Sequence, residues 1–347
     1  MVDIVREPVV SLPPEVLLSV RGLKTYFAQD EGLVRAVDGV SFDVTAGATL
    51  GIVGESGCGK SVTARSVLRI VDRPGRIVEG EIRFRRRDAD GRPGQVVDLA
   101  TLAPNGPEMR AIRGAEIALI FQEPMSSFSP VHTVGNQIVE AIRLHQPVSR
   151  REARDKAVEI LRRVGVSSPE QRIGQLSNQL SGGLRQRAMI AMALSCRPTL
   201  LIADEPTTAL DVTTQTQILE LMRQLQKEDG MAIMLITHDL GVVAEMATDV
   251  AVMYLGRVVE QAPVDAIFHD PRHPYTRALL RSIPRIRSRT RERLTPIAGA
   301  VPHPYDRPAG CPFHPRCPDF MAGTCDGQAP SLRPVAAQHT VSCFLYA

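Results

Sequence analysis

The eight residues GESGCGKS, Gly54 to Ser61, are the stretch that decides the fold. They match the pattern Gly-x4-Gly-Lys-Ser/Thr of a phosphate-binding loop (P-loop), and they lie between a strand-like run, TLGIVG, and a helix-like run, KSVTARSVLRIV. Glycines let successive backbone N–H groups turn toward one phosphate, and the helix N-terminus adds a favourable dipole. A glycine-rich turn with an accidental lysine is the alternative, and this context disfavours it.

The residue types within this loop predict contacts with a nucleotide. Lys60 can neutralise charge on the β- and γ-phosphates, and the hydroxyl of Ser61 can ligate Mg²⁺. The other residues of the loop that we expect to contact the nucleotide are Gly54, Ser56, Gly57, Cys58, Gly59 and Val62.

The run TLLIADE, residues 199–205, predicts the second half of the site. Its apolar residues form a buried strand that delivers two carboxylates to the end of the strand. Asp204 would hold the magnesium ion, directly or through water, and Glu205 would polarise the attacking water as general base. Two acids that merely end a strand are the alternative, which the presence of the P-loop disfavours.

The run LSGGLRQR, residues 180–187, predicts a second phosphate contact. It places Ser181, Gly182 and Gly183 at the start of an apolar helix, where N–H donors and the helix dipole suit an anion. One nucleotide does not need two such loops on one chain. We therefore expect two chains arranged head to tail, each closing over the nucleotide of the other.

Two single residues at strand ends complete the predicted site. Gln122, in LIFQEP, can reach the metal and the attacking water, and His238, in LITHD, can contact the γ-phosphate. A lone histidine after a strand is usually structural. Its place after the strand that follows the two acids favours a functional role here.

Strand and helix signals alternate along the chain, which predicts an α/β fold. Helical signals dominate residues 133–194, where Ser149 and Glu152 have capping-box spacing and Gly165 can end the helix. The stretches expected as strands or hairpins are residues 16–53, 199–205, 231–239 and 250–260, and a further helix is expected at 213–228.

Other segments give weaker signals. The helix after the P-loop is expected to carry Val67, Leu68 and Val71 on one face. Residues 72–115 predict strands with exposed hairpin turns, and we expect their arginines to form a solvated edge instead of an anion contact. The expected irregular segments are a leader at residues 1–15 and a linker at residues 282–310.

Composition limits the class of protein. The 347 residues are 44% hydrophobic and 23% charged, as in a soluble globular protein, and a net charge of +3 is too balanced to favour nucleic acid as the main partner. No apolar run reaches the roughly 18 to 20 residues that span a bilayer. The N-terminus, MVDIVREPVVSLPPE, lacks the layout of a signal peptide, so we expect a cytosolic chain that other subunits could hold at a membrane.

The order of these motifs resembles that of ATP-binding-cassette (ABC) ATPases over residues 16 to about 262. The resemblance implies a P-loop NTPase (RecA-like) domain with a helical subdomain at about 123–198 and an antiparallel β subdomain. It also implies ATP and Mg²⁺ as ligands and places Asp211, in ALD, in a loop that couples two sites across a dimer. Phe27 would stack on adenine, with Tyr26 as runner-up and a buried strand aromatic as the alternative.

Three further stretches resemble the ATPases of oligopeptide/dipeptide importers: FQEPMSSFSPVHTVGNQI (121–138), HPYTRALL (273–280) and GCPFHPRCP (310–318). The resemblance implies a C-terminal extension at 263–347 and a peripheral location on the cytoplasmic face of a bacterial inner membrane. Implied partners are two transmembrane permease subunits, a second ATPase chain (a paralogue more than a second copy) and an extracytoplasmic peptide-binding protein. The chain reads LSNQLSGG where relatives tend to have a Pro-His pair, which weakens claims about local contacts there.

Four cysteines near the C-terminus follow the spacing Cys-x5-Cys-x7-Cys-x17-Cys, which lacks the close pairs typical of structural zinc. Loops that bring such thiolates together suit a cubane cluster, and the resembled family implies a [4Fe–4S] cluster. Zinc and unmetallated thiols remain as alternatives. The expected role of a bound cluster is structural, to pin the C-terminal tail. Cys58 and Cys196 are expected to be small packing residues outside this set. The four cysteines are Cys311, Cys317, Cys325 and Cys343.

Two rival classes remain from the sequence. One is a soluble ABC ATPase that acts on nucleic acid or ribosomes, against which the near-neutral charge and the single cassette argue. The other is an iron–sulfur regulatory protein that uses ATP as a switch. A peptide importer explains more of the motifs than either rival.

Overall fold

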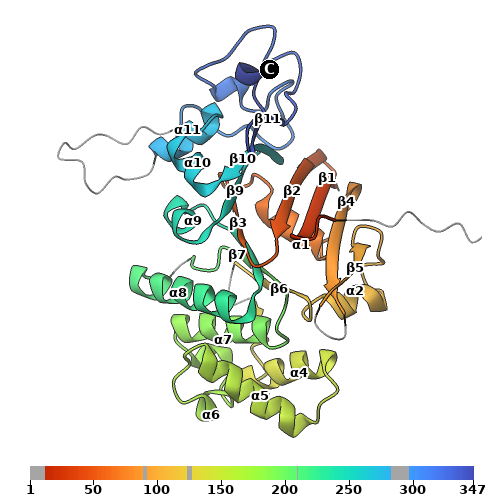
Figure 1. Cartoon of the computed structure of the whole chain (residues 1–347), viewed down its shortest axis with the longest axis vertical. Helices are drawn as coiled ribbons and strands as arrows, with labels where there is room; N and C mark the ends of the chain where they lie inside the picture. Colours follow the sequence, from red (N-terminus) through yellow and green to blue (C-terminus); the bar gives the residue numbers. More distant parts are fainter. Residues whose placement is uncertain (1–11, 89–91, 123–126, 209, 283–296) are drawn as a thin grey trace, which may run out of the picture.

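The computed structural model describes residues 12–88, 92–122, 127–208, 210–282 and 297–347. Its centre is an eight-stranded sheet in the order β11-β12-β10-β9-β3-β8-β7-β6 (Figure 1). The strands from β6 to β9 run parallel, and β10, β12 and β11 continue the sheet antiparallel. The bounds are β3 Thr49–Val53, β6 Ile117–Ile120, β7 Leu200–Asp204, β8 Ala232–Ile236, β9 Asp249–Tyr254, β10 Arg257–Pro263, β11 Arg333–Ala336 and β12 His339–Val341.

The central strands β3, β7 and β8 are buried over their whole length, because both faces of a parallel sheet are covered. Side chains alternate between the two faces. In β7, Leu201 and Ala203 join the core with the helical region, whereas Leu200 and Ile202 join the core with the second sheet. The polar residues that follow these strands therefore lie at one edge, where the carboxyl ends of the strands meet.

A second, four-stranded antiparallel sheet has the order β2-β1-β4-β5. It corresponds to the predicted antiparallel β subdomain. Residues 16–53 form strands as expected, although β1 and β2 are longer than the apolar runs alone suggest. The bounds are β1 Val16–Gln29, β2 Gly32–Thr45, β4 Gly75–Arg87 and β5 Pro93–Asp98.

A helical region lies at the end of the central sheet near β6 and β7 (Figure 1). The predicted capping box is present: the N–H of Glu152 donates to Oγ of Ser149 at 3.2 Å, and the N–H of Ser149 donates to Oε2 of Glu152 at 2.8 Å. Gly165 follows that helix with φ +76°. The helices of this region are α4 Val134–His145, α5 Arg150–Arg163, α6 Pro169–Arg172 and α7 Gly182–Leu194.

The remaining described helices flank the two sheets. They are α1 Lys60–Val67, α2 Pro107–Ile112, α8 Val212–Asp229, α9 Leu240–Met246, α10 Val264–His269 and α11 Pro274–Arg281. Helix α8 matches the helix expected at 213–228 to within one residue at each end. None of the helices in the described part of the chain is long and apolar enough to cross a membrane.

The helix after the P-loop ends earlier than expected. Helix α1 stops at Val67 because Arg69 adopts a left-handed conformation with φ +56°. The guanidinium of Arg113 donates to the freed carbonyl of Leu68 at 2.9 Å, which stabilises this end. The prediction that Val71 shares a helical face with Val67 and Leu68 is therefore wrong.

The prediction that the arginines of β4 form a solvated edge is wrong for two of them. Arg86 forms a two-bond ion pair with Glu116, with N–O distances of 2.6 and 2.8 Å. Arg85 donates to the backbone carbonyls of Leu12 and Pro13 at 2.8 and 3.0 Å. The arginine-rich strand thus fastens the end of the predicted leader and the start of β6. The rest of that leader, residues 1–11, lies outside the described residues.

The C-terminal region continues the central sheet. Strand β12 pairs with β10, and the buried carboxylate of Glu260 receives three partners there. Nε2 of His339 lies 2.7 Å from Oε1 of Glu260, and the N–H groups of Arg272 and His273 donate to its oxygens at 2.6 and 2.9 Å. One carboxylate thereby joins β10, β12 and the start of α11.

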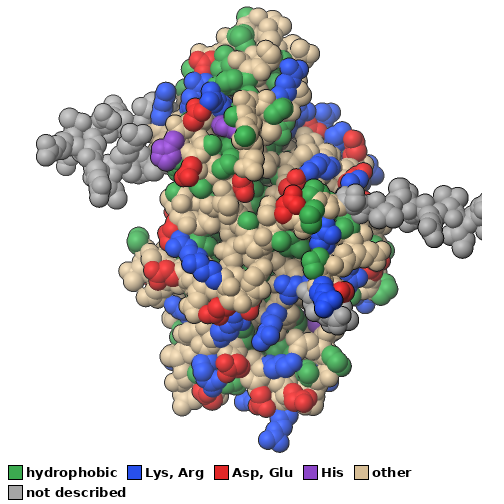
Figure 2. Space-filling view, in the orientation of Figure 1, with side chains coloured by type: hydrophobic (Ala, Val, Ile, Leu, Met, Phe, Trp, Pro, Cys, Tyr) green, Lys and Arg blue, Asp and Glu red, His purple; other side chains and the backbone are tan. Residues whose placement is uncertain are grey.

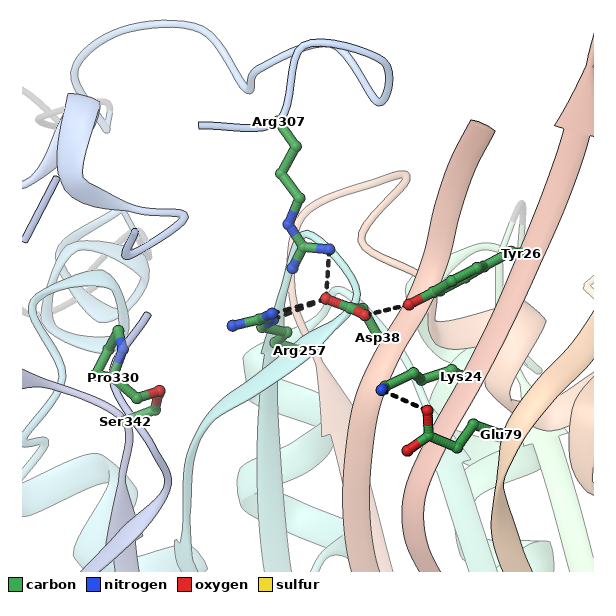
Figure 3. Close-up of polar contacts among 8 residues, drawn as sticks. All are labelled: Lys24, Tyr26, Asp38, Glu79, Arg257, Arg307, Pro330 and Ser342. Carbon is green, nitrogen blue, oxygen red and sulfur yellow. Dashed lines mark hydrogen bonds and ion pairs between the residues drawn. The ribbon is translucent and has the colours of Figure 1, made fainter. Parts of the chain in front are cut away.

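A second contact joins the C-terminal region to the antiparallel sheet. Figure 3 shows Asp38 of β2 between Tyr26, Arg257 and Arg307, and each donates to its carboxylate at 2.6 to 3.1 Å. Burial opposes the charge on Asp38, but the hydrogen bonds from Tyr26 and Arg257 and the charges of both arginines outweigh it and lower its pKa. Arg307 belongs to the predicted linker, part of which, residues 283–296, lies outside the described residues.

The surface carries mixed charge. On the face drawn in Figure 2, Lys and Arg side chains are interspersed with Asp and Glu side chains over both the sheet and the helical region. This pattern agrees with the balanced net charge of +3.

Candidate functional site

Four neighbouring strands of the central sheet end at the candidate site. β3 leads into the P-loop, β6 into Gln122, β7 into Glu205 and β8 toward His238. These strands are adjacent in the order β3-β8-β7-β6, so their carboxyl ends bring together residues that lie far apart in the sequence. An edge of this kind is the usual ligand site of parallel α/β sheets.

The P-loop is shaped by close backbone contacts. A Cβ at Gly54 would lie 2.2 Å from the carbonyl oxygen of Met253, and a Cβ at Gly59 would lie 2.2 Å from that of Ala36. Only glycine fits at these two positions. Nζ of the buried Lys60 donates to the carbonyls of Gly54 and Glu55 at 2.8 and 3.1 Å, so the lysine bends back over the loop.

The other loop residues differ in how far they are exposed. Ser56 and Gly57 are exposed at the crest of the loop, and Val62 is half-buried on α1. Cys58 is buried, and burial raises the pKa of its thiol, which agrees with a packing role beside its place in the loop. Cys196 is half-buried and lies outside the C-terminal set of cysteines.

Ser61 and Asp204 provide oxygen ligands of the kind that Mg²⁺ prefers. Oγ of Ser61 donates to Oδ1 of the buried Asp204 at 3.0 Å. Burial raises the pKa of Asp204, and the charge of Glu205 adds to this effect. The amide oxygen of Gln122 is the third candidate ligand, so the donor set fits a hard divalent cation.

Glu205 is held by three side chains. Nε2 of Gln122 donates to its Oε2 at 3.0 Å, Oγ1 of Thr208 donates to the same oxygen at 2.9 Å, and Nδ1 of His238 lies 3.2 Å from its Oε1. Burial opposes the charge on Glu205, but the hydrogen bonds from His238 and Thr208 outweigh it and lower its pKa. The site therefore favours an ionised Glu205, which a general base requires.

The backbone at Glu205 is also constrained. Its φ is +49°, a left-handed conformation that is uncommon for a residue with a side chain. Its N–H donates to the carbonyl of Ile236 in β8 at 2.8 Å, which holds the residue in this conformation. Strain of this kind is commonly found at functional sites.

Sequence analysis missed two residues of this site. Thr208 follows Glu205 by three residues, and that spacing of a hydroxyl after a carboxylate could have identified it. The side-chain amide of Gln186, on α7, donates to the carbonyl of Pro206 and connects the LSGG helix to the loop after Glu205. Gln186 and Pro206 are 20 positions apart and meet only in the folded chain, so no local sequence pattern could have identified Gln186.

The two candidate adenine-stacking residues lie in β1 with different surroundings. The hydroxyl of Tyr26 donates to Asp38 at 2.6 Å, and burial together with this bond raises the pKa of Tyr26 to about 12. The half-buried ring of Phe27 packs close to Gly75, where a Cβ would come within 2.4 Å of the ring. The hydroxyl of Tyr26 is thus occupied by Asp38, and Phe27 remains the predicted stacking residue.

The LSGG segment lies at the N-terminus of α7, away from α1 in Figure 1. Oγ of Ser181 accepts from the N–H of Leu184 at 3.4 Å as the N-cap, and a Cβ at Gly182 would meet open space. Gly183 lies near α8, where its Cβ would be 3.1 Å from Thr214. This helix end is therefore available to a group from outside the chain.

Asp211 caps the adjacent helix α8. Its Oδ1 accepts from the N–H of Thr214 at 3.0 Å, and its Oδ2 accepts from Oγ1 of Thr214 at 2.7 Å. Its neighbour Ala209, part of the same predicted loop, lies outside the described residues. The cap fixes Asp211 at the start of α8, close to the LSGG segment.

The four C-terminal cysteines line one small pocket together with His273, Phe313 and Asp319. The N–H of Cys311 donates to the carbonyl of Cys325 at 2.7 Å. Burial raises the pKa of Cys311, Cys343 and Cys317, the last to about 11. Even so, in the part of the chain that the structure describes, no group of three or more His, Cys, Asp or Glu side chains is arranged as a metal-binding site.

Comparison with known structures places the fold. A dimeric ATP-binding cassette in a post-hydrolysis state, bound to ADP and Pi, matches with a TM-score of 0.61 and 25% identity over 72% of this chain and 99% of that one. A dimeric bacterial ABC transporter cassette matches with a TM-score of 0.60 and 26% identity over the same shares. The fold and the strand-end site define an ABC ATPase, and the predicted α/β P-loop fold is confirmed.

Comparison with known sequences narrows the family. The family described as ABC transporter matches residues 37–208, and the one described as oligopeptide/dipeptide transporter, C-terminal region, matches residues 259–325. The dipeptide transport ATP-binding protein of Escherichia coli is 47% identical over 94% of this chain and 96% of its own length. The oligopeptide transport ATP-binding protein of Bacillus subtilis is 49% identical over 95% and 97%. A protein of Sinorhizobium fredii named probable peptide ABC transporter ATP-binding protein is 51% identical over 95% of both chains.

The chain therefore belongs to the ABC transporter ATP-binding proteins. Within them it belongs to the group that carries the oligopeptide/dipeptide transporter C-terminal region, as the resemblance of residues 273–280 predicted.

Proposed function

We propose that this chain is the ATP-hydrolysing subunit that powers import of di- or oligopeptides across a bacterial cytoplasmic membrane. The observation that carries this proposal is the position of the Glu205 carboxylate, held between Gln122 and His238 at the strand ends beside the P-loop. Relatives named as dipeptide and oligopeptide transport proteins, 47% and 49% identical, support the class of cargo. In this proposal the ATPase domain spans 16–262, with a helical subdomain at about 123–198, after a leader at 1–15 and before an extension at 263–347.

The residues of the site divide the chemistry of hydrolysis among them. Lys60 and the N–H groups of the P-loop bind the β- and γ-phosphates. Ser61, Asp204 and Gln122 would hold Mg²⁺, which neutralises phosphate charge when bound. Glu205 accepts a proton from the attacking water, and His238 contacts the γ-phosphate and orients Glu205.

A second cassette completes each site. The open N-terminus of α7, with Ser181, Gly182 and Gly183, suits the γ-phosphate of a nucleotide on another chain. Asp211 would couple the two sites across the seam. The dimeric cassettes that this fold resembles support this arrangement, and we favour a paralogous chain over a second copy as the partner.

A face of the helical region suits the two permease subunits. Val131 and Leu144 are 76% and 73% exposed there, and an open groove between α4 and the start of α5 is lined by Val139, Arg143 and Arg150. Apolar side chains left this exposed commonly mark a protein contact. Docking there would hold the chain on the cytoplasmic face of the membrane, with an extracytoplasmic peptide-binding protein as a further member of the complex.

Transport itself is the direct test of the proposed function. The chain, co-expressed with the neighbouring subunits and reconstituted in proteoliposomes with the binding protein, is expected to drive ATP-dependent uptake of a labelled peptide. Recovery of the chain with nucleic acid or ribosomes, without membrane subunits and without uptake, would instead favour the soluble rival. A sharp change in ATPase activity when the cluster is lost, without any peptide transport, would favour the regulatory rival.

The C-terminal cysteines are proposed to bind a [4Fe–4S] cluster. The support is their convergence on one pocket from three separate loops and the spacing without close pairs. A cluster bound there would pin the C-terminal region, because it would tie together segments that share few apolar contacts. Zinc and free thiols are the alternatives.

Metal analysis decides among the three. Anaerobically purified protein is expected to contain about four iron and four sulfide per chain, as a cubane requires. The variant Cys317→Ser should lose most of the iron, whereas Cys196→Ser, a control outside the pocket, should keep it. One zinc per chain, or no metal at all, would contradict the cluster.

A further inference from the structure

Glu55, the second residue of the P-loop motif, is held from the C-terminal region. Nη1 and Nη2 of Arg316 donate to Oε2 and Oε1 of Glu55 at 2.7 and 3.0 Å, a two-bond ion pair. The N–H of Glu55 donates to the hydroxyl oxygen of Tyr275 at 2.9 Å. Both the carboxylate and the backbone amide of this residue are therefore occupied by side chains from more than 200 positions further along the chain.

Arg316 cannot easily leave this position. Its side chain is 3% exposed. Its Nε donates to the carbonyl of Ala298 at 3.0 Å and its Nη1 to the hydroxyl of Tyr254 at 3.3 Å, and its guanidinium lies within 6.0 Å of the ring centres of Tyr254 and Phe313. The ion pair with Glu55 and the hydrogen bond with Tyr254 outweigh the effect of burial and raise the pKa of Arg316, so the arginine stays charged.

Tyr275 is fixed by the same aromatic cluster. Its ring centre lies 4.7 Å from that of Tyr254 and 5.3 Å from that of Phe313. The residue belongs to the HPY turn, in which Nδ1 of His273 accepts from the N–H of Tyr275 at 3.0 Å as the cap of α11. In this turn His273 faces the cysteine pocket and Tyr275 reaches the P-loop.

The charge of Glu55 matters for a loop that binds a polyanion. The carbonyl of Glu55 accepts from Nζ of Lys60, so any movement of Glu55 also moves the acceptor of that lysine. An unpaired carboxylate in the loop that binds the triphosphate would repel it, because two like charges a few ångströms apart interact strongly at the low effective dielectric near a protein. Arg316 removes that repulsion and fixes the loop.

We propose that Arg316 and Tyr275 are positioning residues of the nucleotide site, which makes the C-terminal region a working part of the P-loop. Arg316 neutralises and orients Glu55, and Tyr275 fixes its backbone. Arg316 directly precedes Cys317, so the segment that carries the cysteines is the segment that sets the loop. This inference rests on the proposed binding of ATP by the P-loop.

The test is equilibrium binding of Mg-ATP to the full chain by titration calorimetry. Arg316→Ala is expected to weaken binding on the order of 10-fold, because the charge of Glu55 is left unpaired. The double variant Glu55→Gln with Arg316→Ala should return to within about threefold of wild type, since the repelling charge is gone. A general loss of structure would not be rescued in this way.

Two further variants separate positioning from folding. Tyr275→Phe keeps the aromatic cluster and removes one acceptor, so binding should weaken about threefold to tenfold even if Arg316→Ala does not fold. Arg333→Ala removes an exposed arginine of the C-terminal region, whose Nε donates to Ser331 outside the cysteine pocket, and should leave affinity unchanged.

Two results would overturn the inference: unchanged affinity in both Arg316→Ala and Tyr275→Phe, or a double variant as weak as the single one. Wild-type protein that fails to bind Mg-ATP would instead refute the proposed function itself.

Discussion

Turnover of ATP is expected to fall on the order of 10²- to 10⁴-fold when Glu205 is replaced by glutamine, while nucleotide binding persists. Glutamine keeps the size of the side chain but cannot accept the proton of the attacking water. It also places an amide group where Gln122, Thr208 and His238 now all face a carboxylate. The phosphate contacts of the P-loop remain, so affinity should change little.

The measurement compares phosphate release with binding of Mg-ATP in the same preparation. Glu220→Gln makes the same chemical change on the exposed face of α8 and should behave as wild type. Because unhydrolysed ATP holds two cassettes together, the Glu205→Gln assembly should also accumulate in a clamped state that crosslinking detects. Hydrolysis at the wild-type rate would exclude Glu205 as the base.

Loss of Lys60 is expected to act on binding itself. Lys60→Ala removes a buried ammonium group that donates to two carbonyls of the P-loop and that we propose to meet the phosphates. Hydrogen bonds to charged groups are individually strong, so affinity for Mg-ATP should fall on the order of 10²-fold.

Direct titration with Mg-ATP checks this expectation. The control Lys156→Ala removes an exposed lysine of α5, far from the P-loop in the sequence. Its Nζ donates to the side chain of Gln146. The melting temperature should be compared as well, so that loss of fold is not mistaken for loss of affinity. An unchanged dissociation constant in a folded Lys60→Ala protein would contradict our assignment of the loop.

Much of the nucleotide site could be predicted because its signals are local. The P-loop, the acids of β7 and the residues after β6 and β8 each depend on a short motif at the end of a strand, and parallel strands bring such ends together. The capping box of α5 is likewise contained within four residues. Residue roles such as those of Phe27 and Asp211 remain predictions.

The contacts that sequence reasoning missed are long-range or conformational. Arg316 and Glu55 are 261 positions apart, and no local pattern pairs an arginine among cysteines with a P-loop acid. The early end of α1 depends on the left-handed conformation of Arg69, and arginine carries no preference for it. The partners of the β4 arginines, such as Leu12 and Glu116, lie 73 and 30 positions away, and no sequence pattern predicts that these segments are neighbours.

The pairing of β12 with β10 has a practical consequence for anyone who shortens this protein. A chain cut after Pro263 would leave the outer side of β10 without its neighbour, and bare strand edges are prone to stick to other molecules. The cut would also remove His339 and the two backbone amides that now satisfy the Glu260 carboxylate, and it would expose that side of β10. A shortened cassette for crystallisation or screening should therefore retain β12 and also Cys343, the last cysteine of the C-terminal pocket.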